Sequence, residues 1–166
     1  KKIKDIFTMV LKGHIGVTTF NLNKNTTGNK IDKVARAPLK SKGKDYAHGT
    51  GHGVGHFLNV HEGPHSISKF NKVKFSEGMI VSNEPGYYKK NKFGIRIENL
   101  VYVKKLNSKI FFENLTLAPI DKDLINFDLL TKKEFNYLND YNKKIYQSLN
   151  PYLKKKENNW LKSFIN

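Results

Sequence analysis

The chain of 166 residues contains no cysteine, a single tryptophan and only 14 acidic residues against 30 basic ones. Without cysteine it can form neither a disulfide nor a thiolate metal site, and iron–sulfur chemistry is excluded. No apolar run approaches the roughly 18 residues that a membrane-spanning helix needs, so we expect no transmembrane segment. The absence of cysteine also fits a reducing compartment, and we expect a cytoplasmic protein.

The net charge of +16 comes almost wholly from lysine, because Arg36 and Arg96 are the only arginines. A positive balance of this size is the first sign of a nucleic-acid-binding protein. Here the lysines are scattered, their main run is Lys154-Lys155-Lys156, and no recognisable nucleic-acid motif accompanies them. We therefore interpret the charge as a solvated surface and expect no nucleic-acid partner.

Two helices are expected in the first part of the chain. Hydrophobic residues make up 38% of the sequence, enough for a folded domain with a core. Apolar residues recur at three- and four-residue spacing from Lys2 to about Gly16, and this period predicts a helix. No capping residue precedes it, so we expect the natural chain to extend further N-terminally. A second helix is expected around Lys30–Leu39, and Pro38 should end or kink it.

The middle of the chain predicts a sheet. Residues 48–64 are too rich in glycine for a helix, and we expect loop or extended backbone that closely approaches another group. A strand is expected over residues 57–61, and short β-rich runs separated by turn signals then predict an antiparallel sheet. These runs are Met79–Val81, Ile95–Ile97, Leu100–Val103, Ile110–Phe112 and Leu115–Leu117.

Two more helices are expected after the sheet. Thr131 is a good N-cap, and Glu134 stands at the capping-box position ahead of an apolar face that reaches Leu149. Pro151 then begins a last helix that carries Trp160. We find no internal repeat in the sequence.

Histidines and glutamates that could carry chemistry stand inside glycine-rich, apolar frames between residues 48 and 98. The frames read H-G-T-G-H-G-V-G-H-F-L-N-V-H-E-G-P from His48, M-I-V-S-N-E-P-G-Y-Y from Met79 and F-G-I-R-I-E-N from Phe93. His48 and His52 are four residues apart, as in helical zinc peptidases, but the glycines between them oppose a helix and supply no catalytic Glu. A helical zinc site is therefore not expected.

Two glutamates end or interrupt apolar strand patterns. Glu84 follows the run at Met79–Val81, and Glu98 alternates with isoleucines on the same strand face as Arg96. A carboxylate that faces inward needs a partner: a metal, an arginine or a hydrogen-bond network. Oxygen and nitrogen donors without cysteine suit Mn, Co or Zn, and we interpret the two glutamates with His52 as a metal site.

Other residues have simpler interpretations. A lone histidine is more often a structural residue than a ligand. We expect His14 to pack where its helix ends, and His56 and His65 stay open between the mouth of a pocket and the surface. For Glu98 the alternative to a metal is a salt bridge to Arg96.

The strings together resemble the C-terminal part of the catalytic domain of a eukaryotic cytosolic-type Xaa-Pro aminopeptidase. That family belongs to the pita-bread metallopeptidases, with prolidase and methionine aminopeptidase. V-L-K-G-H-I at residues 10–15 and a tail that starts at Leu115-Thr116-Leu117 match as well, so the resemblance runs from about Lys4 to Leu161.

The resemblance implies an α+β fold: the C-terminal portion of the pita-bread (creatinase/aminopeptidase) fold. This fold has a curved antiparallel sheet with flanking helices and a C-terminal helical tail. The resemblance also implies a boundary near residue 120. Residues 1–120 would be the C-terminal part of the catalytic domain, and residues 121–166 the tail of eukaryotic-type relatives.

A set of metal ligands also follows from the resemblance. The family holds two divalent ions, usually manganese, with two Asp, one His and two Glu. His52 resembles the histidine ligand, and Glu84 and Glu98 resemble the glutamates, with Glu98 bridging both ions. None of the aspartates near the start of the chain stands in a matching context. We therefore expect both Asp ligands upstream and interpret the chain as a fragment.

Further roles are implied around this site. Glu84, His48 and His61 resemble the catalytic residues of the family, and the two histidines line its substrate site. Tyr88 and Arg96 resemble residues of the substrate pocket.

The implied activity is release of the N-terminal residue from peptides with proline at the second position, by water activated between two metal ions. The resemblance also implies a homodimer for the full-length protein. Two alternatives stay open: a non-catalytic pita-bread-like module that binds protein or nucleic acid, and a relative specific for prolidase or methionine substrates.

Overall fold

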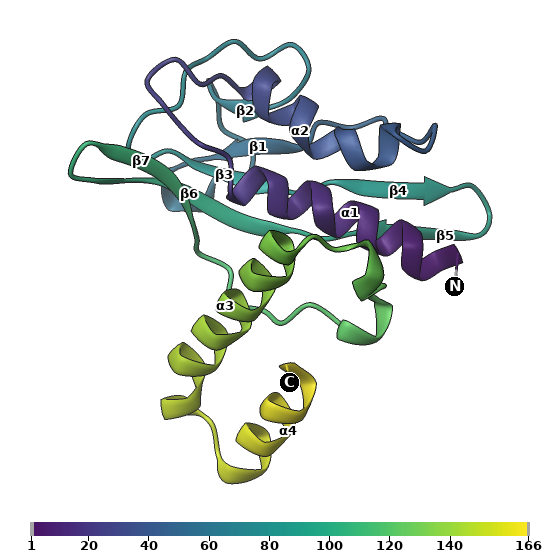
Figure 1. The fold of residues 1–166 in the computed structure, drawn as a ribbon. Coiled ribbons are helices and arrows are strands. Elements are labelled where there is room, and N and C mark those ends of the chain that lie inside the picture. Colours follow the sequence, from purple (N-terminus) through teal and green to yellow (C-terminus); the bar gives the residue numbers. More distant parts are fainter. Residues whose placement is uncertain (1, 166) are drawn as a thin grey trace. The chain divides into compact units, whose positions relative to one another are not determined.

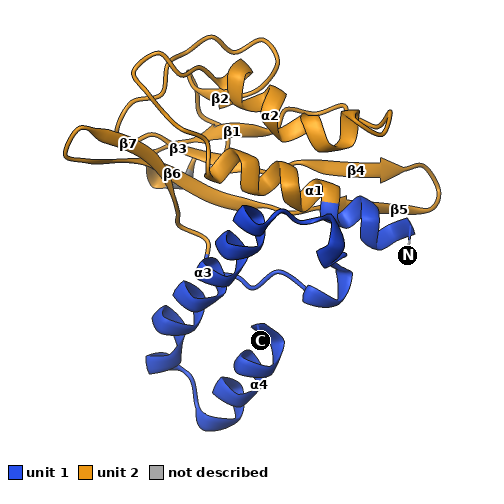
Figure 2. Ribbon diagram, viewed as in Figure 1, with its two compact units in different colours: residues 1–8, 117–166 blue, residues 9–116 orange. Residues whose placement is uncertain are grey.

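The computed structural model describes residues 2–165, without the side chain of Leu58. These residues form two compact units (Figure 2). One unit is Met9–Thr116, and the other combines Lys1–Thr8 with Leu117–Asn166. Within the described residues, no helix is both long enough and apolar enough to cross a membrane.

Both helices expected at the start of the chain are present. Helix α1 covers Lys2–Thr18 and helix α2 covers Gly28–Lys40. Pro38 lies inside the last turn of α2, and the helix runs two residues past it. A proline this close to the helix end removes only one backbone hydrogen bond, so the helix ends at Lys40 and not at Pro38.

The sheet of the first unit is antiparallel throughout, as expected (Figure 1). Its strand order is β2-β1-β3-β6-β7, and a separate hairpin pairs β4 with β5. The strand bounds are β1 Gly51–Val54, β2 Ser66–Ile67, β3 Ile80–Asn83, β4 Gly86–Lys89, β5 Phe93–Arg96, β6 Asn99–Leu106 and β7 Lys109–Asn114.

Two expected strands are wrong. The segment expected as a strand over residues 57–61 begins as a short 3-10 turn, η1 (His56–Leu58), in which Phe57 has a left-handed φ of 53°. The strand is instead β1, inside the glycine-rich stretch itself. The run at residues 115–117 is also not a strand, because β7 ends at Asn114 and Thr116 folds back to accept a hydrogen bond from the backbone of Leu100.

The core of the first unit lies between helices and sheet. Val17 of α1 and Ile31 of α2 pack with Val81 and Val101 of the central strands, and all four side chains are fully buried. The helices can approach each other closely at Gly13, where a Cβ would lie 2.2 Å from the carbonyl oxygen of Ala35. This packing gives the central strands a rigid support on one side.

The second unit is helical after Leu117. It contains η2 (Lys122–Leu124), η3 (Phe127–Leu129), α3 (Lys132–Leu149), η4 (Asn150–Tyr152) and α4 (Lys155–Ile165). The capping box at the start of α3 is confirmed, because Thr131 and Glu134 bond each other's backbone N–H. Tyr141 and Ile145 of α3 pack on Leu161 of α4 and form a small core.

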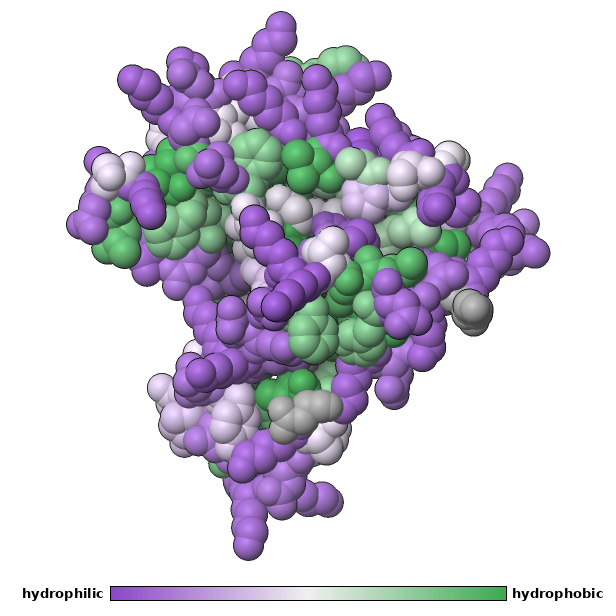
Figure 3. All heavy atoms as spheres, in the orientation of Figure 1, coloured by the Kyte–Doolittle hydropathy of each residue, from purple (hydrophilic) through white to green (hydrophobic). Residues whose placement is uncertain are grey.

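The lysines are on the outside. No lysine within residues 2–165 is buried, and hydrophilic residues cover most of the face drawn in Figure 3. The basic charge is therefore accessible to solvent, as expected.

His14 is buried in α1, as expected for a structural residue. Its side chain is completely inaccessible, and within the described residues neither ring nitrogen has a hydrogen-bond partner. Burial lowers the pKa of His14 from 6.5 to about 3. The folded chain therefore carries a neutral imidazole at a pH at which the unfolded chain already binds a proton.

We predict that His14 makes the fold sensitive to acid. Because the folded pKa is depressed, the free energy of unfolding should fall as the pH drops below 6.5, by up to about 1.4 kcal/mol per pH unit from this group. Substitution of His14 by Leu should remove this part of the slope in urea unfolding between pH 7 and pH 4.5. Val10→Ala, a cavity variant in the same helix, should lower stability equally at every pH. An unchanged slope in the His14→Leu variant would contradict the prediction.

Candidate metal centre

Three side chains from separate parts of the first unit bring ligand atoms together. One atom each of His52, Glu84 and Glu98 lies within 4.8 Å of the others. His52 is on β1, Glu84 follows the end of β3, and Glu98 stands between β5 and β6. Glu84 is buried and His52 half-buried, but Glu98 is exposed, so the inward-facing carboxylate that we expected is found only at Glu84.

Strand register explains why these residues meet. β3 and β6 are antiparallel with Asn83 opposite Asn99, and one further step along both chains sets Glu84 opposite Glu98. β1 pairs with the other edge of β3, with Gly53 opposite Val81, which brings His52 level with the end of β3. The central strand thus positions all three ligand candidates.

The contact between β1 and β3 depends on glycine. A Cβ at Gly51 would lie 1.8 Å from the carbonyl oxygen of Ser82. At this close approach the backbone N–H of His52 donates to Oγ of Ser82 at 2.9 Å, and that hydroxyl donates to Oε1 of Glu84 at 2.9 Å. Ser82, which the sequence pattern did not identify, therefore links the histidine strand to the glutamate.

The imidazole of His52 is oriented for ligation. Nδ1 donates to the carbonyl of Gly53 at 3.1 Å, which leaves the lone pair of Nε2 free. Nε2 lies 3.4 Å from Oε1 of Glu84. A bond from the second ring nitrogen to a carbonyl is the usual way in which proteins fix the tautomer of a metal-binding histidine.

Two hydrogen bonds and an ion pair join His48 to Glu84. Nε2 of His48 accepts from the hydroxyl of Tyr88 at 2.9 Å, and this hydroxyl accepts from Nε of Arg96 at 2.9 Å. Nη1 of Arg96 lies 3.6 Å from Oε2 of Glu84. Partial burial disfavours its charge, but the bond to Tyr88 and the carboxylates of Glu84 and Glu98 outweigh burial and raise the pKa of Arg96.

A pocket of about 510 Å³ opens over these groups. The ring of His61 lies 4.1 Å from the ring of His52, centroid to centroid. Seven residues were expected at the site, and six of them line this pocket; Tyr88 is the seventh and bonds two of the six. The six are His48, His52, His61, Glu84, Arg96 and Glu98.

The structure also tests the expectations for His56, His65 and the surroundings of Glu98. His65 is buried and donates from Nε2 to the carbonyl of Ile80 at 2.6 Å, so it is structural, whereas His56 is exposed. The ion pair of Arg96 is with Glu84, and the alternative of a salt bridge to Glu98 is wrong for the described residues. β5 ends at Arg96, so the strand alternation that we extended to Glu98 does not reach it.

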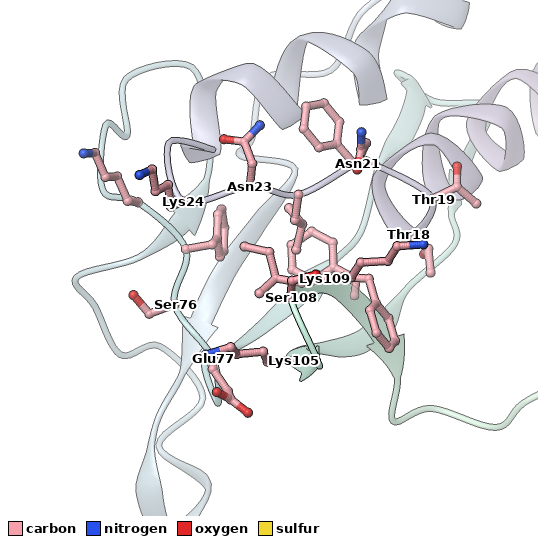
Figure 4. Close-up of a pocket in the computed structure, with 17 residues that line it drawn as sticks. Thr18, Thr19, Asn21, Asn23, Lys24, Ser76, Glu77, Lys105, Ser108 and Lys109 are labelled. Atoms are coloured by element: carbon pink, nitrogen blue, oxygen red, sulfur yellow. The ribbon is translucent and has the colours of Figure 1, made fainter.

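A second cavity, of about 1160 Å³, is lined by the end of α1, the following segment and β7 (Figure 4). Its lining mixes apolar side chains with threonine, serine and asparagine and with four lysines, and Glu77 is its single carboxylate; the lysines are Lys24, Lys74, Lys105 and Lys109. It contains no histidine, so it lacks the donor set found around His52.

In the comparison with known proteins, two family models together match nearly the whole chain. The model described as "Metallopeptidase family M24" matches residues 1–105, and the model described as "C-terminal region of peptidase_M24" matches residues 110–165. Xaa-Pro aminopeptidase 1 of Dictyostelium discoideum is 47% identical over 97% of this chain and 28% of its own length. A probable Xaa-Pro aminopeptidase P of Coprinopsis cinerea is 46% identical over 94% of this chain and 27% of its own.

Solved structures similar to this chain are enzymes of the same kind. The X-prolyl aminopeptidase of Caenorhabditis elegans, described as a cytosolic enzyme with a di-nuclear active site, is 36% identical with a TM-score of 0.90. It is matched over 100% of this chain and 29% of its own. The prolidase of Pyrococcus furiosus is 30% identical with a TM-score of 0.60, over 70% of this chain and 33% of its own. This chain thus spans less than a third of the length of these relatives.

We predict that Gly51 is required for the geometry of the site. Gly51→Ala places a methyl group against the backbone of Ser82 and should lower the free energy of unfolding by about 1–3 kcal/mol, as overpacking does. Gly49→Ala is the matched control, since its Cβ would meet its nearest atoms at an ordinary 3.6 Å. Urea unfolding of both variants tests the prediction, and equal midpoints would refute it.

Proposed function

This chain belongs to metallopeptidase family M24, and on that basis we propose that it forms part of the active site of an Xaa-Pro aminopeptidase. Its fold is the C-terminal portion of the pita-bread fold found in the matched enzymes. The observation that carries the proposal is the cluster of His52, Glu84 and Glu98 beneath a pocket that His48 and His61 also line.

The donor set fits divalent metal. One imidazole with a free Nε2 and two carboxylates, with ligand atoms within 4.8 Å of one another, suit a hard or borderline ion. We propose two ions, and manganese as their identity, with cobalt or zinc as substitutes. By the resemblance to the family, we propose that two aspartates from outside these 166 residues complete the site.

Proline explains why such a site is needed. The bond before proline is a tertiary amide without an N–H and with a restricted backbone, which general exopeptidases accommodate poorly. Divalent ions at these carboxylates supply a water of lowered pKa and polarise the carbonyl. Glu84 would take the proton of that water and return it to the proline nitrogen as the bond breaks.

The histidines would act on the substrate carbonyl. His48 and His61 lie on the wall of the pocket, where an N–H donor would stabilise negative charge as it develops on oxygen. In the structure both nitrogens of His48 are engaged, one by the carbonyl of Gly49 and one by Tyr88. Tyr88 and Arg96 would therefore orient the ring of His48 at the pocket wall, and Nε2, which accepts from Tyr88 here, would have to carry a proton before it could donate to a substrate carbonyl.

The wider assignments are part of the same proposal. Peptides with proline at the second position are the substrates, the complete protein is a homodimer, and it acts in the cytoplasm, like the enzyme described as cytosolic. We retain a boundary near residue 120 between catalytic portion and helical tail. The alternative of a non-catalytic binding module is disfavoured by the three ligand candidates, which are all present and mutually close.

We predict that His52 is a metal ligand in this chain by itself. Titration with Co²⁺, followed by visible absorption and calorimetry, should show binding that His52→Ala weakens by at least about 10-fold, since each ligand contributes strongly to affinity. His56→Ala is the matched control, because that exposed ring lies outside the cluster. Equal weakening by both variants would remove the cluster as the binding site.

We predict manganese-dependent release of the first residue of an Arg-Pro-Pro type peptide by the complete protein. Chelator should abolish it, and Glu84→Gln should lower kcat by about 10²–10⁴-fold, the range for loss of a general acid–base group. Metal content of the variant is measured on the same sample, to separate loss of the proton carrier from loss of the ion. Full activity in Glu84→Gln would contradict the assignment. The same assay of the 166-residue chain shows whether its ligands suffice alone.

A further inference from the structure

Arg36 of α2 makes an unusual number of contacts for one side chain. Its Nε donates to Oδ2 of Asp32 at 2.8 Å, and Nη1 donates to Oδ1 of Asp45 at 2.7 Å and to the carbonyl of Tyr46 at 2.7 Å. Nη2 donates to the carbonyl of His48 at 2.6 Å. The guanidinium thus binds the backbone of the segment that leads into β1, at His48 itself.

The partner carboxylate secures the other side of His48. Oδ1 of Asp32 accepts from the hydroxyl of Thr50 at 2.7 Å, and Thr50 also bonds the hydroxyl of Tyr46 at 2.5 Å. Asp32 and Thr50 are buried, with 2% and 0% exposure. His48 therefore lies between two anchored residues, Tyr46 and Thr50, that both connect to one ion pair on α2.

The buried polar groups of this network have hydrogen-bond partners. Both oxygens of Asp32 accept, the face of Tyr46 lies 4.0 Å from the guanidinium carbon of Arg36, and Asp45 closes the outer side. Burial raises the pKa of Asp45, but the bonds from Arg36 and from the backbone of Tyr46 outweigh it, and the net pKa is lowered. A buried ion pair adds little net stability over apolar packing, so its role is better sought in the geometry that it fixes.

Lysine could not replace this arginine. Four acceptors in different directions require the planar fork of a guanidinium, whereas an ammonium is a compact point charge. Only 2 of the 30 basic residues in the chain are arginines. One is Arg96 in the pocket, and the other is Arg36, whose hydrogen bonds in the described chain include none to His52, Glu84 or Glu98.

We infer that Arg36, with Asp32, is a positioning residue for the reaction. It fixes residues 45–50 so that the imidazole of His48 reaches the pocket and the hydroxyl of Tyr88. It acts through His48 and does not contact the substrate or the metal ligands. The inference rests on the proposed function, since it gives His48 a substrate-side role.

A double-mutant cycle on the complete protein tests this inference. Arg36→Lys should lower kcat/KM for an Xaa-Pro peptide on the order of 10²-fold, the size expected for a catalytic group displaced by about 1 Å. His48→Ala should lower it at least as much, and the double variant should equal His48→Ala alone. Co²⁺ affinity should stay unchanged in all three. Additive losses, or loss of metal affinity in Arg36→Lys, would overturn the inference.

The control is Lys40→Ala on the same helix. Lys40 lies 3.6 Å from Asp45 but bonds none of the backbone around His48, so kcat/KM should not change. Should Arg36→Lys fail to fold, Thr50→Val replaces it in the cycle, because it removes the bond to Asp32 at nearly equal volume.

A readout without turnover separates this inference from the proposed function. In metal-free protein, the ¹⁵N resonances of the His48 ring should shift in Arg36→Lys and stay in place in Lys40→Ala. If wild-type protein cleaves no Xaa-Pro peptide, the proposed function fails, and the NMR result still decides whether Arg36 positions His48. Unshifted His48 resonances would overturn the inference in either case.

Discussion

The candidate centre depends on the close approach of β1 and β3. Where the two strands meet, no side chain fits between Gly51 and the carbonyl of Ser82, and the glycine lets the backbones touch. That contact brings the N–H of His52 to the hydroxyl of Ser82 and, through it, to Glu84. Antiparallel pairing on the other side of β3 then places Glu98 opposite Glu84. A single central strand therefore determines the separation of all three ligand candidates.

Charge is balanced locally around this strand. Two carboxylates that face each other repel, and the positive groups nearest to Glu84 are Arg96 and, when protonated, His52. Arg96 is also bonded to Tyr88, so its position is set independently of the glutamates. The guanidinium thus lies beside Oε2 of Glu84, whereas Nε2 of His52 lies beside Oε1.

The sequence predicted those features that a local pattern determines. The periodicity of α1 and α2, the capping box at Thr131 and most strands of the sheet follow from residue spacing alone. A strand was wrongly expected at residues 57–61 because apolar residues there suggested a sheet, whereas Phe57 adopts a left-handed turn between glycine and asparagine. The glycine-rich stretch was expected to be loop or extended backbone that closely approaches another group, and β1, with its close approach to Ser82, confirms the extended alternative; the local pattern did not show which strand would be the neighbour.

The same limit explains which site residues could be found. His52, Glu84 and Glu98 were identified by their frames, which resemble a known family. Ser82 and Arg36 were not, because their roles arise from partners 30 and 12 residues away along the chain. One signal was present: arginine is rare here, and a rare arginine one helical turn after an aspartate on an otherwise lysine-rich helix indicates a need for its geometry.

The structure also separates two kinds of support. His52 is carried by β1, and Glu84 and Glu98 stand directly beyond the paired residues Asn83 and Asn99 of β3 and β6, so their spacing follows from strands that pack on both helices. His48 and His61 stand on segments outside the strands, where no strand-to-strand hydrogen bonds hold the backbone in place. His48 gains its order from side-chain bonds to α2, which can be altered without changing the sheet. The three ligand candidates and His48 are therefore held in place by different interactions.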